Sequence, residues 1–197
     1  MKKTLTIILA FVLVIAMSVA GTVAYLTAQT GAVTNTFTVG NIGDLTLTEE
    51  KGTVVDGKHT FNIVPGQDIA KDPKVTYTAD EPDVAVYVFV KMDATGWTTT
   101  DGQTYTKAAG SVTEALSFSI DTTAWTKLEN GVYYKALDAN TDLAATSVIA
   151  NDTIAVSDSI AKDDIGTLAG SDLVFTAYAI QQAGFDTAAA AWAEVNK

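Results

Sequence analysis

Apolar and polar residues alternate in several short stretches of the chain, and this pattern constrains the fold more than any other feature. Clear examples are residues 45–48, 60–64 and 74–78. A period of two places alternate side chains on opposite faces of a β-strand, whereas a helix needs a period of about 3.6. Pro65-Gly66 ends the second stretch, and this dipeptide suits a type II turn because Gly supplies the positive φ. The pattern predicts an all-β chain built from short strands.

Residues 84–90 differ from the other stretches because the run is apolar on both faces. A strand with two apolar faces has to be covered on both sides, so we expect it to lie centrally in a sandwich. Further strands are expected at residues 34–39, 132–134, 153–156 and 173–180. Asp101-Gly102 and Asn130-Gly131 are typical of hairpin turns. Many short strands joined by such turns predict a jelly-roll-like β-sandwich.

Helix is expected in only two places. Residues 187–195 are rich in Ala, with Asp186 available as the N-cap and Trp192 as the apolar anchor. This pattern predicts a short C-terminal helix. A second helical turn is expected around residues 112–116.

Residues 1–24 have the layout of a signal peptide. A basic start at residues 2–3 precedes an apolar run over residues 5–20, and small residues follow. The run is shorter than the roughly 20 residues of a membrane span, so cleavage is favoured over a retained anchor. The residues themselves allow a cut after Ala20 or after Ala24. We therefore expect a secreted protein, in the extracellular matrix or at the cell surface, with no stable membrane anchor after cleavage.

Charge and cysteine content exclude several classes of function. The net charge is −11, all 12 basic residues are lysine, and there is no cysteine. An acidic chain without guanidinium groups lacks the usual means of binding phosphates and base edges, so we expect no nucleic-acid partner. The absence of cysteine excludes disulfides and thiolate metal sites.

The sequence offers little for catalysis. His59 is the only histidine, whereas a Ser-His-Asp triad needs a carboxylate and a nucleophile beside it and zinc protease motifs need two histidines. Residues 138–142 match the start of a calcium loop, but Leu143 and Ile149 occupy positions that require Gly and Glu. We therefore predict no enzyme activity, no catalytic residue, no cofactor and no metal site.

Three groups of segments resemble the TasA/camelysin family of secreted biofilm matrix fibre proteins. They are residues 21–27 with 35–40, residues 63–68 with 71–75, and residues 177–181 with 184–186 and Trp192. The first group resembles the family's leader and mature start, and the second its Pro-Gly-Asp and Lys-Asp-Pro turn. Members of this family are cut by the dedicated signal peptidase SipW. The resemblance places the cut between Ala24 and Tyr25.

The resemblance implies three parts: residues 1–24 as a cleaved signal peptide, residues 25–40 as an extended N-terminal arm or donor strand, and residues 41–197 as the β-sandwich. Family members polymerise when the arm of one subunit completes the sheet of the next. The implied partners are other copies of the chain, the signal peptidase and other matrix proteins. The apolar anchors expected along the arm are Leu26, Val33, Phe37 and Val39. So few anchors do not bury an isolated arm, which instead fits strand addition to an open edge.

Three other functions compete with the fibre subunit. One is a monomeric secreted adhesion module for carbohydrate or protein, in which Trp97, Trp125 and Tyr105 form a stacking platform. Another is a secreted, metal-dependent hydrolase that uses His59. The third is a pilin-like protein in which Lys–Asn isopeptide bonds replace disulfides, although the sequence specifies no pair.

Overall fold

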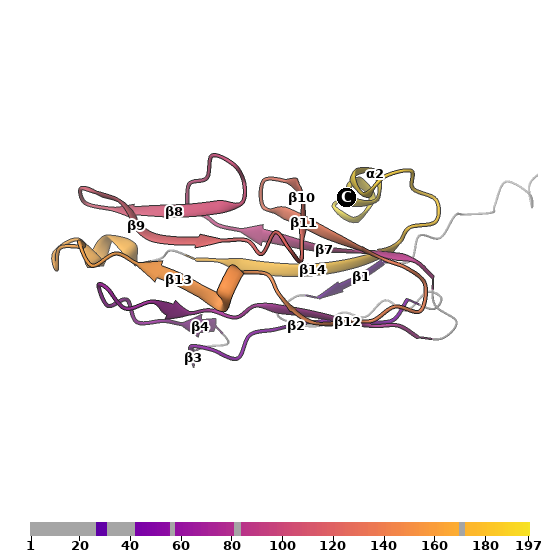
Figure 1. Ribbon diagram of the computed structural model, residues 1–197, viewed down its shortest axis with the longest axis horizontal. Helices are drawn as coiled ribbons and strands as arrows, with labels where there is room; N and C mark the ends of the chain where they lie inside the picture. The colour runs from indigo at the N-terminus through magenta and orange to yellow at the C-terminus, as the bar shows by residue number, and fades with distance from the viewer. Residues whose placement is uncertain (1–26, 31–41, 56–57, 81–83, 170–171) are drawn as a thin grey trace, which may run out of the picture.

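The computed structural model describes residues 27–30, 42–55, 58–80, 84–169 and 172–197, and for residues 27–30 it describes the backbone alone. The predicted all-β sandwich with one short C-terminal helix is confirmed. Strands run along the long axis of the molecule, and helix α2 (Ala188–Val195) lies toward the opposite end from the β3–β4 hairpin (Figure 1).

The largest sheet has five antiparallel strands in the order β1-β14-β7-β11-β10. Their bounds are Thr27–Thr30 (β1), Val174–Gln181 (β14), Val86–Asp93 (β7), Val132–Leu137 (β11) and Thr126–Glu129 (β10). β7 is therefore central, as residues 84–90 predicted. β1 and β10 are the two edges of this sheet.

Two smaller sheets contribute to the same core. One has the order β12-β6-β2 and the other the order β5-β13-β9-β8. Their bounds are Leu143–Ser147 (β12), Lys74–Thr78 (β6), Asp44–Thr48 (β2), Ile69–Ala70 (β5), Thr153–Val156 (β13), Val112–Ser119 (β9) and Thr104–Ala109 (β8). A separate hairpin joins β3 (Thr53–Val55) to β4 (Lys58–Thr60), and the 3-10 turns are η1 (Ala150–Asp152) and η2 (Ile165–Leu168).

The two apolar faces of β7 pack against different partners. Val86, Val88 and Val90 are buried in the core shared by the sheets. Phe89 belongs to a second cluster with Trp192 of α2, and the two ring centroids are 5.3 Å apart. The helix therefore covers the outer face of β7, which explains an apolar run without alternation.

Two helix predictions need correction. Residues 112–116 do not form a helical turn but begin strand β9, which pairs with β8 and with β13. Pairing with β8, and with β13 at Leu116, satisfies backbone groups that a single helical turn would leave free. The N-cap of α2 is Thr187, not Asp186, and its side chain accepts a hydrogen bond from the Ala190 amide.

The predicted turns agree with the structure more closely than the predicted bounds of the neighbouring strands do. The Gln67 amide donates to the Val64 carbonyl across the predicted Pro65-Gly66 turn, where Gly66 has φ 74°. The expected strand at residues 60–64 is wrong, because β4 ends at Thr60. The strand ends there because its partner β3 is only three residues long. Asn130-Gly131 does join the β10–β11 hairpin.

Candidate functional site: an open strand edge beside an apolar groove

Part of the predicted N-terminal arm pairs with the sheet of its own chain. β1 lies antiparallel to β14, with the register running from Thr27 opposite Ile180 to Thr30 opposite Ala177. β1 is short, and among the described strands it pairs with β14 alone. The predicted cleavage residues Ala24 and Tyr25 and the arm anchors Leu26, Val33, Phe37 and Val39 lie outside the described residues. The signal-peptide segment 1–24 lies outside them as well.

β14 is paired along its whole length on one side but only in part on the other side. β7 pairs along its whole length, from Val174 opposite Asp93 to Gln181 opposite Val86. β1 pairs only with residues 177–180, and within the described part of the chain no strand pairs with residues 174–176 on that side. Val174, at the start of this stretch, is 55% exposed. An unpaired strand edge of this kind is a template for pairing with another chain.

A cavity of about 710 Å³ lies beside this open edge. One side consists of Val174, Phe175 and Thr176 of β14, and another of Leu47 and Thr48 of β2. Most other side chains that line it are apolar. They include Phe61, Ile63, Ile69, Trp97, Leu116, Ile154, Leu168 and Leu173. An apolar groove next to unpaired backbone groups provides both halves of a strand-binding site, namely main-chain bonding and side-chain pockets.

Trp97 lines the cavity and has an unused hydrogen-bond donor. Its Nε1 is buried and has no partner among the described residues. The ring itself is held in place by Phe118, with edge-on centroids 5.0 Å apart. A buried donor without an acceptor costs about 1–3 kcal/mol.

Lys71 forms part of the groove wall, and it is buried despite its charge. Its ammonium lies 2.6 Å from Oε1 of Glu49. It also lies 5.0 Å from the ring centroid of Phe61 and 5.7 Å from that of Phe175. These contacts tie the segment after β5 to the end of β2 and to the open half of β14.

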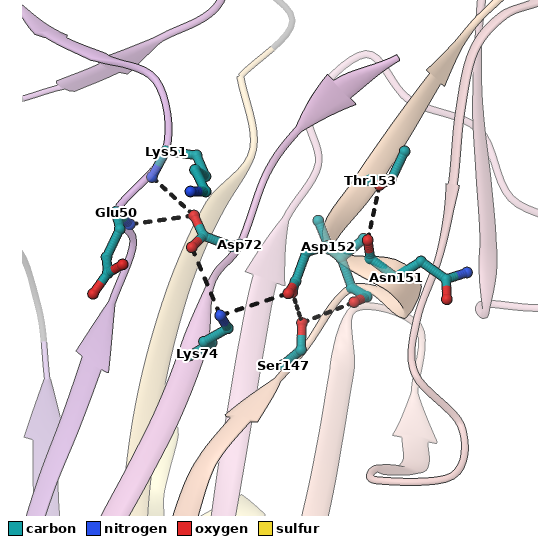
Figure 2. A network of polar contacts seen from close by, with 9 residues as sticks. Glu50, Lys51, Asp72, Lys74, Ser147, Asn151, Asp152 and Thr153 are labelled. Atoms are coloured by element: carbon teal, nitrogen blue, oxygen red, sulfur yellow. Dashed lines mark hydrogen bonds and ion pairs between the residues drawn. The ribbon is translucent and has the colours of Figure 1, made fainter.

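Asp72 holds the other side of the same segment (Figure 2). Its Oδ1 accepts hydrogen bonds from the backbone amides of Glu50, at 3.2 Å, and Lys51, at 2.9 Å. Its Oδ2 lies 3.8 Å from the ammonium of Lys74, which in turn lies 3.6 Å from Asp152 in η1. Asp72 is 2% exposed. The Lys-Asp-Pro-Lys segment is therefore a clamp that fixes residues 49–51 beyond β2.

Ser147 extends this network to η1 (Figure 2). Its hydroxyl donates to Asp152 and contacts the Ile149 carbonyl oxygen at 2.8 Å. The Lys71 amide donates to the Asp152 carbonyl at 2.8 Å. The wall of the groove is thus fixed by polar contacts that cross from β5 and β6 to β12 and η1.

The other candidate residues, His59 and Asp142, make contacts that stabilise the fold. Nδ1 of His59 lies 2.7 Å from the Lys51 carbonyl oxygen. Asp142, from the stretch compared with a calcium loop, accepts a hydrogen bond from the Ala79 amide at 2.8 Å. Among the residues with described positions, no group of three or more His, Asp or Glu is placed to hold a metal ion.

The proposed aromatic platform is wrong, because its members are directed into the core. Tyr105 is 4% exposed and its hydroxyl lies 2.7 Å from that of Tyr133. Burial and this hydrogen bond raise the pKa of Tyr133 well above its ordinary value. Trp125 is 2% exposed and donates to the Ser147 carbonyl. Trp97 lies in the groove wall rather than beside them on an outer face.

No protein-family model, curated protein or solved structure matches this chain. Across the described residues, no helix is long and apolar enough to cross a bilayer. The resemblance to the TasA/camelysin family therefore rests on sequence segments alone, at residues 21–40, 63–75 and 177–192. The structure adds a role for one of them, because Lys71, Asp72 and Lys74 form the clamp at the groove.

Proposed function

We propose that this chain is a secreted structural protein of the extracellular matrix or cell surface, and that it polymerises into fibres by strand exchange. In each contact, the N-terminal arm of one copy pairs with β14 of the next. The observation that carries this proposal is the pairing of β1 with β14, because a short piece of the predicted arm already uses this edge.

Exchange conserves the contacts of β1. A neighbouring copy brings the same residues in the same register, so the main-chain bonds lost within one chain are regained between chains. The open stretch at residues 174–176 and the groove beside it give the incoming chain further room to bind. The contact is head-to-tail, so copies add one after another and extend into a filament when the rotation between them does not close a ring.

Cysteine pairs test the exchange directly, because the chain has none of its own. Ala28 lies opposite Ala179 in the register of β1 and β14. Opposite residues of antiparallel strands are close enough for a disulfide. We would make A28C and A179C as separate single variants, mix the purified proteins, allow assembly and oxidise.

Strand exchange predicts a disulfide between residue 28 of one variant and residue 179 of the other, identified in the linked peptide by mass spectrometry. The doubly substituted protein should then give a covalent ladder on a non-reducing gel. Only intramolecular bonds in the double variant, with no linked peptide in the mixture, would contradict exchange. Circular dichroism of each variant controls for folding.

An adhesion module is the second candidate, and one feature favours it. A groove of about 380 Å³ lies over the sheet that contains β9 and β13. Its polar lining consists of Asp68, Thr104, Ser117, Ser119, Asn151 and Thr153. Hydroxyl, amide and carboxylate groups are suited to a carbohydrate. Retention on a polysaccharide resin that is lost in N151A would support this function, and absence of retention would leave it without support.

A further inference from the structure

Lys71 and Glu49 bring an amine and a carboxyl group together where both side chains are largely buried. The side chains are only 7% and 17% exposed, and Nζ lies 2.6 Å from Oε1. The rings of Phe61 and Phe175 lie near the same ammonium. A buried amine beside a single carboxyl group has the proximity that a condensation reaction requires.

Lys74 provides a contrast within the same segment. It lies 3.8 Å from Asp72 and 3.6 Å from Asp152, and its side chain is 34% exposed. Its longer distances, shared carboxylates and access to water favour an ordinary ion pair. Among the described residues, Lys71 has Glu49 as its one carboxylate partner within ion-pair distance.

We propose that Lys71 and Glu49 form an intramolecular isopeptide bond. The Lys71 ammonium first transfers a proton to the Glu49 carboxylate, which leaves a neutral amine and a neutral acid. Nζ then attacks Cδ, the Cδ–OH bond breaks, and the hydroxyl departs with a proton from Nζ as one molecule of water.

The bond would join the end of β2 to the segment after β5 and enclose the β3–β4 hairpin, across a sequence separation of 22 residues. A covalent loop limits the freedom of the unfolded chain as a disulfide does. This chain has no cysteine with which to make a disulfide. The inference does not depend on fibre formation, since the bond lies within one subunit.

Intact-mass spectrometry of the purified mature protein tests the proposal. Loss of one water lowers the mass by about 18 Da relative to the sequence, as a covalent modification would. After trypsin digestion, the peptide that ends at Lys51 should be joined to the peptide that begins at His59. A mass equal to that of the sequence, both in fresh protein and after prolonged incubation of the folded protein, would overturn the proposal.

Two variants locate the bond, and one matched variant controls for it. K71R keeps the charge and removes the nucleophile, and E49A removes the carboxyl group, so both should retain the full sequence mass. K74R alters the neighbouring lysine and should still lose one water. Circular dichroism confirms that each variant folds. A loss of water that persists in K71R or E49A would assign the bond to other residues and overturn this pair.

Discussion

The two edges of the five-stranded sheet differ, among the described residues, in the features that protect an edge strand from pairing. The β10 edge carries Lys127 and Glu129, and its register shifts between them, as at a β-bulge. Glu129 also accepts a hydrogen bond from the Trp192 indole at 2.9 Å. Charges, bulges and covering side chains are the usual protections of an edge strand.

The opposite edge has none of these features among the residues the structure describes. β1 and β14 contain no charged residue, and residues 174–176 extend past the end of β1. Among the described residues, the comparison indicates that the β10 edge carries protective features and that the β1–β14 edge does not. A subunit with a single available edge would grow in one direction, by head-to-tail contacts.

Placing a charge on the β14 edge should have the largest effect, which is slower filament elongation. Lys at position 174 would occupy an exposed site on β14, so it should hinder an incoming strand and leave the fold intact. We expect V174K to slow filament elongation by about tenfold, which corresponds to roughly 1.4 kcal/mol. Light scattering and sedimentation measure the rate and the polymerised fraction.

The matched control is T126K on β10, because Thr126 is also exposed and lies on the protected edge. T126K should assemble at the rate of the unmodified protein. Equal slowing by the two variants would mean that added charge, rather than the edge, sets the rate.

Breaking the clamp at the groove should have the next largest effect, which is a lower free energy of unfolding. Removing the buried carboxylate in D72A leaves the backbone amides of Glu50 and Lys51 without their acceptor. We expect unfolding to become easier by about 2–3 kcal/mol, as for other broken buried charge contacts. Urea denaturation gives the value. D142A, which removes the exposed contact to the Ala79 amide, should cost about 1 kcal/mol or less.

Removing the protection of β10 should create a second adhesive edge. The double variant K127V/E129V replaces both charges by β-branched apolar residues, which favour strand pairing. We expect lateral bundles in place of single filaments, visible by electron microscopy and as faster sedimentation. Single filaments of unchanged width would show that the charges do not protect this edge.

A substitution in the turn beside β10 should have the smallest effect. It should change thermal stability only at acidic pH. The amides of Thr104 and Gln103 donate to Asp101, and they lower the pKa of its carboxyl group below 3.8. A carboxyl group whose pKa is lowered by folding stabilises the protein above its unfolded pKa, and this contribution is lost as pH falls through the folded value. D101N should therefore reduce the loss of thermal stability below about pH 4. An unchanged acid profile would contradict this role.

The alternating patterns predicted which residues are in strands better than they predicted which strands pair. Residues 74–78 and 153–156 are strands with the expected bounds, because alternation reports which face of a strand is buried. Alternation carries no information about neighbours, so the pairing of β1 and β7 with β14 was not accessible from sequence. Residues 112–116 were misassigned because Glu114, Ala115 and Leu116 favour helix locally, a preference that pairing with β8 overrides.

The groove is harder to predict from the sequence than the strands are. Lys71 and Asp72 are buried charges, and charged residues of this kind are ordinarily exposed. Their burial depends on Glu49 and on the amides after β2, which lie about two dozen positions earlier in the chain. The one signal in the sequence is the Lys-Asp-Pro segment, which indicates a family resemblance but no contact.

Negative-stain electron microscopy of two proteins tests the central claim most directly. One is the mature chain beginning at Tyr25, and the other lacks Tyr25 to Val39, which removes β1. The account predicts filaments of the first protein and folded monomers of the second. Monomers of both proteins, at high concentration and across a range of pH, would contradict it, as would filaments of the shortened chain.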